Sequence, residues 1–236
     1  MKGWMVMGKI NLKNLTGKIR DKKFRVKVEK FFESSLKKMG RMGGVDFFSS
    51  PAGKSHHHSY VGGLVQHTFS TVKIALALVD VLEKVYGWKN INKDYVLAGA
   101  LLHDLYKPAT YIFRENGTID FSSLGERLDH LSILVGEAYK NNFPTDFIHV
   151  LAASHGDSSP ISPKTIEALI VHLADYVDSR LMGEIQKAAY YLTKKCVGET
   201  LPKISPKDAL KIVYAKQAGG CEEVRKTFEK LKRKTG

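Results

Sequence analysis

Val96-Leu-Ala-Gly-Ala-Leu-Leu102, followed directly by His103-Asp104, is the stretch that decides the fold. A helix that is apolar on every face must be buried, which is typical of the centre of an all-helical protein. A buried carboxylate is costly unless a cation compensates it, so Asp104 needs a positive partner. One interpretation is a pair of His⁺ and Asp⁻ in the core. The other is a metal ion in the groove beside the helix, where both side chains can reach it.

A second apolar segment repeats this arrangement. Residues 166–174 are almost wholly apolar apart from Glu167 and His172, and they lead into Asp175-Tyr-Val-Asp178. His172, Asp175 and Asp178 follow one another at intervals of three residues, so they share one face of a helix. Two apolar helices that each lead to a carboxylate predict a common cation between them.

The histidines are concentrated in one part of the chain, because all nine lie between His56 and His172. His67 follows Gly62-Gly63 by one turn of a third predicted helix and offers the cation another direction of approach. Imidazole together with carboxylate suits Mn²⁺, Fe²⁺, Co²⁺, Ni²⁺ or Zn²⁺ better than Ca²⁺, and Mg²⁺ is possible. The lack of cysteine ligands argues against structural zinc. We therefore expect a catalytic site with one or two divalent ions.

Helical spacing dominates the remaining sequence. Asp94 is expected to cap one helix, and Asn116-Gly117 between two short apolar runs predicts a β-hairpin within residues 110–122. The pattern is that of an all-α bundle with one small β-hairpin and extra terminal helices. The predicted helices cover residues 19–39, 64–86, 95–105, 125–139, 146–154, 163–193, 206–218 and 222–234.

The net charge of +13 comes from the two ends of the chain. Residues 1–41 carry a net +10 and residues 203–236 a net +6, whereas the middle is net −3. Basic ends attract polyanions such as RNA, DNA or nucleotides; the alternative is a solvated lysine-rich surface. The length fits one domain. We divide it into a basic N-terminal helix and loop (1–52), a catalytic core (53–202) and basic C-terminal helices packed on the core (203–236).

The two cysteines and the lengths of the apolar segments indicate in which cellular compartment the protein is expected. Cys196 and Cys221 lack the spacing of a zinc knuckle, which predicts no disulfide framework and a reducing cytoplasm. No segment reads as a secretory signal or an uninterrupted membrane span. We therefore expect a cytoplasmic protein without a membrane partner, and the sequence leaves the oligomeric state open.

The order His67, His103-Asp104 and Asp175 resembles the H…HD…D signature of HD-domain phosphohydrolases. The HD pair stands in Leu-Leu-His-Asp-Leu-Tyr-Lys, the last aspartate stands in His-Leu-Ala-Asp-Tyr-Val-Asp, and the likeness spans residues 53–182. The resemblance implies an HD-domain helical bundle in which these four residues hold one ion.

Family members with two metals have further histidines between the HD pair and the last aspartate. His130 and His155 stand in that interval. The resemblance therefore implies a second ion held by these two histidines, with Asp104 bridging to the first. Tyr106 stands where the family usually has glycine, which is expected to alter access to the ions.

The stretch that begins at His57-His58 and ends at His67-Thr68 is similar to the corresponding part of bacterial HD-domain 3′-to-5′ exoribonucleases. It also resembles an HD-like domain of conjugative-element proteins. The chain before this region is too short for the OB-fold domain of the exoribonucleases, which argues against processive RNA degradation.

These observations predict a metal-dependent phosphohydrolase acting on nucleotides or single-stranded RNA or DNA, with Asp104 at its centre. A bound ion can activate water and polarise a phosphoryl oxygen. Lys107 is either a phosphate-binding cation or a solvated lysine. His57 and His58 either donate to the phosphate or leaving group, or belong to a polar loop. The alternative function is a nucleic-acid-binding module with a structural or inactive metal site.

Overall fold

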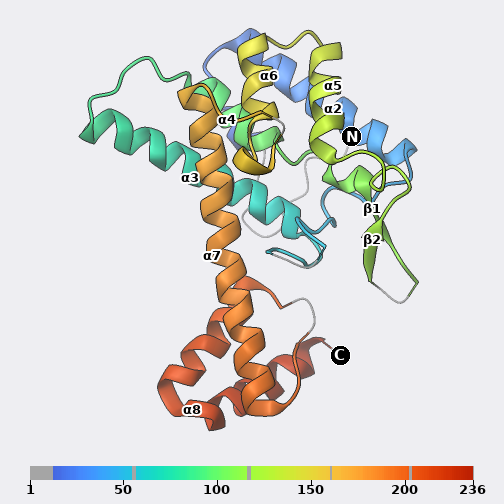
Figure 1. Ribbon diagram of the computed structural model, residues 1–236, viewed down its shortest axis with the longest axis vertical. Coiled ribbons are helices and arrows are strands. Elements are labelled where there is room, and N and C mark those ends of the chain that lie inside the picture. Colours follow the sequence, from blue (N-terminus) through green and yellow to red (C-terminus); the bar gives the residue numbers. More distant parts are fainter. Residues whose placement is uncertain (1–12, 55–56, 116–117, 160, 202–203, 236) are drawn as a thin grey trace.

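The computed structural model describes residues 13–54, 57–115, 118–159, 161–201 and 204–235, which form a helical protein with one two-stranded sheet (Figure 1). The predicted all-α class is confirmed. In chain order the elements are α1 (Lys13–Thr16), α2 (Lys22–Arg41), α3 (Gly63–Val85), α4 (Lys93–Leu102), η1 (Lys107–Thr110), β1 (Tyr111–Phe113), β2 (Ile119–Phe121), α5 (His130–Lys140), α6 (Thr145–Ala152), η2 (Gly156–Ser158), α7 (Ile166–Val197) and α8 (Pro206–Thr235).

The predicted β-hairpin is present. Strands β1 and β2 pair antiparallel, with Ile112 opposite Asp120. The Asn116-Gly117 turn that predicted it lies outside the described residues. The hairpin follows directly on η1, so it extends from the segment that carries Lys107.

Helix α4 is the centre of the main core. All seven residues from Val96 to Leu102 are buried, and α4 packs against α3, α6 and α7. Gly99 makes this close packing possible, because a Cβ at this position would lie 2.5 Å from Val150 Cγ1 on α6 and 3.2 Å from Val171 Cγ2 on α7. The buried helix therefore brings its last residues, and the HD pair after them, to the meeting point of four helices.

The N-terminal helix α2 belongs to the same core. Its apolar face buries Phe24, Val28, Phe31 and Phe32. Such burial of four large side chains stabilises a fold by several kcal/mol relative to exposing them. The helix is therefore part of the main fold and not a detached basic arm.

The predicted cap of α4 is wrong. Asn92, not Asp94, caps the helix by accepting from the Tyr95 backbone N–H at 3.1 Å. Asp94 instead accepts from the backbone N–H groups of Arg20 and Asp21, each at 2.9 Å. Asn92 and Asp94 are both polar and close to the helix start, so the sequence alone does not show which of them is the cap. The contact of Asp94 with the N-terminal segment leaves that role to Asn92.

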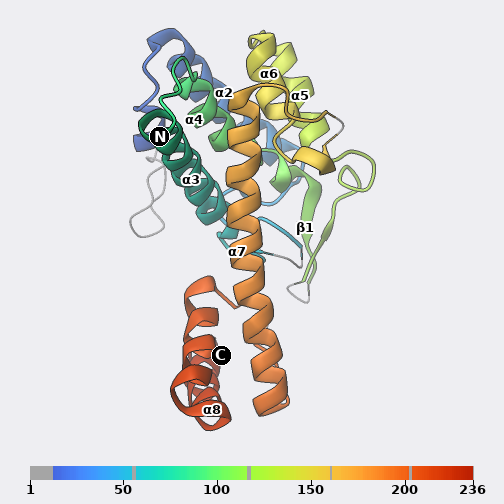
Figure 2. The ribbon, with the colours of Figure 1, turned by 60° about the vertical axis from the view of Figure 1, so that its left-hand side comes forward.

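Helix α7 connects two hydrophobic clusters. Its first half lies in the main core, and its second half packs with α8 into a separate cluster that includes Ala189, Ile212, Val224 and Phe228 (Figures 1 and 2). Helix α8 bends at Gly219 and Gly220, where the backbone leaves the helical region. The division of the chain at residues 52 and 202 remains a prediction.

The expectation of no disulfide is wrong. Cys196 near the end of α7 and Cys221 in α8 are bonded, with their Cα atoms 5.0 Å apart. The packing of α8 against the second half of α7 brings together two cysteines 25 residues apart, which no short spacing motif reveals. The disulfide fastens α8 to α7. The cytoplasmic location remains a prediction.

Helix α3 is an exception to the expectation that no segment is long and apolar enough to span a membrane. By length and composition alone it could cross a membrane, a property that core helices of soluble proteins share. Here its residues Leu64, Val65, Val72 and Ala75 are buried in the main core, and α3 packs against α4 and α7. It also carries His67, which the next subsection places.

Candidate metal centre

The structure brings together all six residues predicted as metal ligands, from five separate segments of the chain. Helix α3 supplies one histidine, the end of α4 supplies the HD pair, and α5 begins with another histidine. The turn after α6 and the first half of α7 supply the remaining two. In chain order these residues are His67, His103, Asp104, His130, His155 and Asp175.

The deeper ligand set consists of His67, His103 and Asp175. The Nε2 atoms of His67 and His103 lie 3.1 Å apart, and Asp175 Oδ1 lies 3.1 Å from His67 Nε2. His67 and His103 have no solvent exposure. Two imidazole nitrogens and a carboxylate oxygen that converge in this way are the ligand chemistry of a divalent transition metal.

The outer set consists of Asp104, His130 and His155. The Nε2 atoms of His130 and His155 lie 2.9 Å apart, and Asp104 Oδ1 lies 3.2 Å from the former and 3.5 Å from the latter. The two histidine side chains are 18% exposed. Solvent therefore reaches the outer set at its two histidines, and it reaches the deeper set only at Asp175, whose side chain is 12% exposed.

Asp104 joins the two sets. Its Oδ2 lies 3.3 Å from His67 Nε2 and 3.5 Å from His103 Nε2, while Oδ1 faces the outer pair. Neither oxygen has a hydrogen bond of good geometry, although Lys107 Nζ forms a 2.6 Å ion pair with Oδ2. A buried carboxylate that faces imidazole nitrogens on both sides has the position expected of a bridging ligand.

Hydrogen bonds at Nδ1 of three of the four histidine rings direct their Nε2 atoms inward. His103 Nδ1 donates to the backbone oxygen of Ala100 at 2.9 Å, His67 Nδ1 donates to Asp178 Oδ2 at 2.6 Å, and His155 Nδ1 lies 2.9 Å from Asp175 Oδ2. With a proton fixed on Nδ1, Nε2 presents a lone pair. Facing lone pairs repel unless a proton or a metal ion lies between them. The six residues therefore fit a divalent cation.

The buried carboxylates of Asp104 and Asp175 stay ionised because positive charge lies close to them. Burial alone would raise the pKa of Asp104, but Lys107 and His103 outweigh it and hold that pKa well below its usual value. Burial likewise opposes ionisation of Asp175, yet hydrogen bonds from His103 and His155 lower its pKa. For His155, carboxylate hydrogen bonds overcome burial and raise the pKa to about 9. A bound cation supplies the same compensation without the extra protons.

The three other predicted site residues surround this centre. Lys107 is almost fully buried, and its pKa stays raised because Asp104 and Asp175 outweigh burial. His57 has its pKa lowered to about 3, chiefly by burial, and is neutral at pH 7. His58 is 1% exposed, and its Nδ1 lies 3.7 Å from Asp178 Oδ2. Their catalytic roles remain predictions.

Some side chains differ from the expectations. Tyr106 is fully buried, and its hydroxyl donates to Ser35 Oγ on α2 at 2.9 Å, so it takes part in core packing. His172 shares a face with Asp175 but packs beneath Gly156, where a Cβ would lie 2.1 Å from its ring. Sequence reasoning placed Asp178 on the correct face without assigning it a role. Its spacing of three residues after Asp175 was the available signal.

Asp178 is the residue that orients His67, and we expect its replacement to weaken metal binding. Asp178→Asn keeps a hydrogen-bond acceptor of the same size but removes the charge that favours the Nδ1 proton. The affinity for Mn²⁺, measured against a competing chelator, should fall by about 10- to 100-fold. The exposed Asp80→Asn on α3, which loses only an ion pair with Lys84, is the control. Equal affinity in the two variants would contradict this role.

The comparisons with known proteins agree with this arrangement. The family model described as the HD domain matches residues 64–180. A dihydroneopterin 2′,3′-cyclic phosphate phosphodiesterase from Methanocaldococcus jannaschii is 46% identical over 171 residues, which are 71% of this chain and 67% of the relative. The 3′-5′ exoribonuclease YhaM from Listeria monocytogenes is 32% identical over 149 residues, 58% of this chain and 44% of that protein.

A further exoribonuclease YhaM, from a Geobacillus species, is 29% identical over 182 residues, 72% of this chain and 49% of the relative. The chain thus spans about two thirds of the phosphodiesterase and less than half of the exoribonucleases. No solved structure matches significantly.

Proposed function

Because the chain belongs to the family of HD-domain phosphohydrolases, we propose that it is a metal-dependent phosphodiesterase that opens a 2′,3′-cyclic phosphate on a small, nucleotide-like substrate. One observation carries the proposal: the two oxygens of Asp104 face two separate sets of imidazole nitrogens. The similarity to the dihydroneopterin 2′,3′-cyclic phosphate phosphodiesterase supports the choice of bond and substrate class.

The reaction is a hydrolysis in which water attacks phosphorus. One of the two ring P–O ester bonds breaks, the departing oxygen receives a proton, and the product is a phosphomonoester. When bound, a divalent ion activates the attacking water and polarises a phosphoryl oxygen. The remaining tasks, which are to bind and orient the phosphate and to move protons, fall to side chains of this protein.

Lys107 and His57 are the side chains that we assign to the phosphate. The Lys107 ammonium is charged and lies 2.6 Å from Asp104. It can therefore form an ion pair with a phosphate that is bound at the centre. His57 is neutral and can donate one N–H to a phosphate oxygen or the leaving oxygen. We place His58 behind them, since its side chain is buried beside Asp178.

The rival functions make different predictions about the substrate. An exoribonuclease would release mononucleotides from RNA, and a nucleotidase would cleave nucleoside monophosphates. A binding module with an inactive site would hydrolyse none of them. The basic ends favour polyanionic substrates in general, because their charge attracts phosphates over a distance of about 10 Å at moderate salt.

A substrate panel tests the proposal. The protein is loaded with Mn²⁺ and given dihydroneopterin 2′,3′-cyclic phosphate, guanosine 2′,3′-cyclic phosphate, guanosine 5′-monophosphate and a 5′-labelled single-stranded RNA. We expect metal-dependent opening of the cyclic phosphates to monoesters, with the other two left intact. Stepwise shortening of the RNA without opening of the cyclic phosphates would replace the proposal by the exoribonuclease function, and no hydrolysis at all would favour the binding module.

A further inference from the structure

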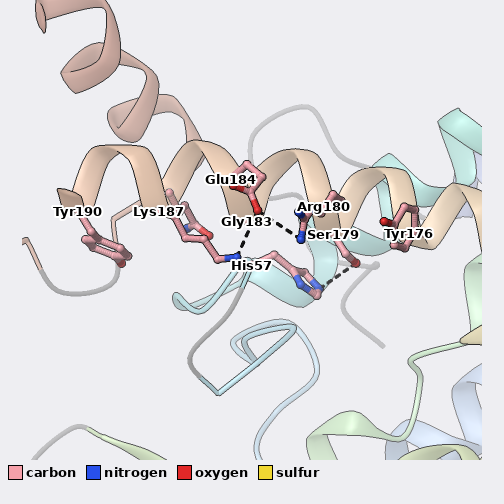
Figure 3. Close-up of a pocket in the computed structure, with 9 residues that line it drawn as sticks. His57, Tyr176, Ser179, Arg180, Gly183, Glu184, Lys187 and Tyr190 are labelled. Carbon is pink, nitrogen blue, oxygen red and sulfur yellow. Dashed lines mark hydrogen bonds and ion pairs between the residues drawn. The ribbon is translucent and has the colours of Figure 1, made fainter. Parts of the chain in front are cut away.

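A cavity of about 240 Å³ lies along α7 beside the metal centre (Figure 3). It begins at His57 and Ser179 and continues past Gly183 to Tyr190. At its inner end His57 Nε2 lies 3.2 Å from Ser179 Oγ, which donates to Asp175 Oδ1 at 3.1 Å. The cavity is thus joined to the proposed metal centre through a chain of two hydrogen bonds.

We propose that this cavity binds the flat heterocycle of the substrate and selects it, an inference that rests on the proposed cyclic-phosphate chemistry. Asp175 and Gly183 are two helical turns apart, a rise of about 12 Å. A heterocycle joined to a phosphate through a short polyol or a ribose can bridge this span. At the far end Tyr190 packs against the hydrophobic cluster formed by α7 and α8, and a volume of about 240 Å³ suits a small molecule better than a polymer.

The walls of the cavity have the chemistry of a heterocycle site. The rings of Tyr176 and Tyr190 stand at its two ends, and aromatic rings stack on flat heterocycles (Figure 3). Glu184 lies between two cations, 3.4 Å from Arg180 and 3.2 Å from Lys187. A guanidinium plane held in this way can also stack on a ring.

Gln186 provides an independent indication of a ligand. It lines the cavity and is 2% exposed, and its Nε2 donates to the backbone oxygen of Ile204 at 2.7 Å. Its Oε1 is buried and has no hydrogen-bond partner within the part of the chain that the structure describes. A buried acceptor without a donor is costly. A heterocycle with an N–H edge, such as the 2-amino-4-oxo ring shared by pterin and guanine, offers the missing donor.

Gly183 indicates that the cavity is kept open. Glycine in the middle of a helix costs about 1 kcal/mol relative to alanine, and a Cβ here would meet nothing within 4 Å. Neither backbone geometry nor packing therefore requires glycine at this position. Gly183, Gln186 and Tyr190 also lie beyond residue 180, where the match to the HD domain ends. On this proposal, the extension of α7 beyond the family core determines substrate specificity.

Gly183→Leu tests the inference, because its Cβ would meet no atom within 4 Å and the rest of the side chain would occupy the cavity. Two substrates carry the same reacting ring: dihydroneopterin 2′,3′-cyclic phosphate, and glycerol 1,2-cyclic phosphate, which has no heterocycle. We expect kcat/KM for the first to fall by about tenfold or more, mainly through KM, and that for the second to stay within about twofold. Gly136→Leu is the matched control, since Gly136 is also a helical glycine with nothing within 4 Å of its Cβ.

Equal losses on both substrates, or no loss on either, would overturn the proposal. Binding of fluorescent neopterin, which has no phosphate, provides a readout that does not depend on hydrolysis, and guanosine in the same titration distinguishes a pterin site from a purine site. If the protein hydrolyses no cyclic phosphate but binds neopterin or guanosine in a manner that Gly183→Leu abolishes, the proposed function fails and the cavity assignment stands. If Gly183→Leu binds both as the parent does, the cavity assignment fails.

Discussion

Asp104→Asn should abolish hydrolysis of every substrate and remove most of the bound metal. The amide side chain would present one neutral oxygen where the parent presents two charged ones, and the two oxygens of Asp104 face the Nε2 atoms of both ligand sets. Loss of this charge at the reacting centre should lower kcat by a factor of about 10³. Elemental analysis of the purified protein and a rate assay with Mn²⁺ measure the two effects.

The fold should survive the Asp104→Asn change, since the main core contains Val96, Leu101 and other apolar residues that the substitution does not touch. Lys107 loses its closest partner, however, and a buried unpaired charge is destabilising. If the single variant folds poorly, the double variant Asp104→Asn, Lys107→Met removes that charge; its metal content and rate are then compared with those of Lys107→Met alone, because Lys107 is itself assigned to the phosphate. Asp120→Asn, a paired carboxylate on the hairpin, is the control. A folded Asp104→Asn protein with full activity would disprove the metal centre.

Much of the centre could be predicted from the sequence, because a carboxylate at the end of a buried apolar helix needs a compensating cation. Val96 to Leu102 is buried as its composition requires, and Asp104 follows it into the core. The family signature then selected His67 and Asp175, and its pattern in two-metal members selected His130 and His155. These assignments needed only the order of residues along the chain.

Contacts between distant elements could not be predicted in the same way. The disulfide between Cys196 and Cys221 depends on how α8 folds back along α7, and the role of Asp94 depends on where the N-terminal segment lies. The Asp178 hydrogen bond to His67 joins residues 111 positions apart. Periodicity shows which face a residue occupies but not which partner that face meets.

The cavity along α7 was also invisible in the sequence. Gly183 occurs in a helical stretch without any turn signal, and Gln186 is one polar residue among many. Only the structure shows that the first leaves space and that the second has a buried oxygen without a donor among the described residues. A glycine that neither the backbone nor packing requires is a signal worth testing in other long helices of this kind.

His130→Ala should separate the two ligand sets. The deeper set of His67, His103 and Asp175 remains complete in this variant, whereas the outer set keeps only Asp104 and His155. If both sets bind, the parent holds two ions per chain and the variant holds one. The rate of hydrolysis should fall by about 10²-fold or more, because only one of two charges remains to stabilise the phosphate in the transition state.

The matched control is His149→Ala, which removes a histidine that accepts from the Lys164 backbone N–H and belongs to neither ligand set. Mass spectrometry of the intact protein under native conditions counts the ions, and the rate assay is run at saturating Mn²⁺. His130→Ala should fold normally, since the side chain is 18% exposed and lies at the edge of the centre. A parent that holds a single ion, together with an unchanged rate in His130→Ala, would show that the deeper set acts alone.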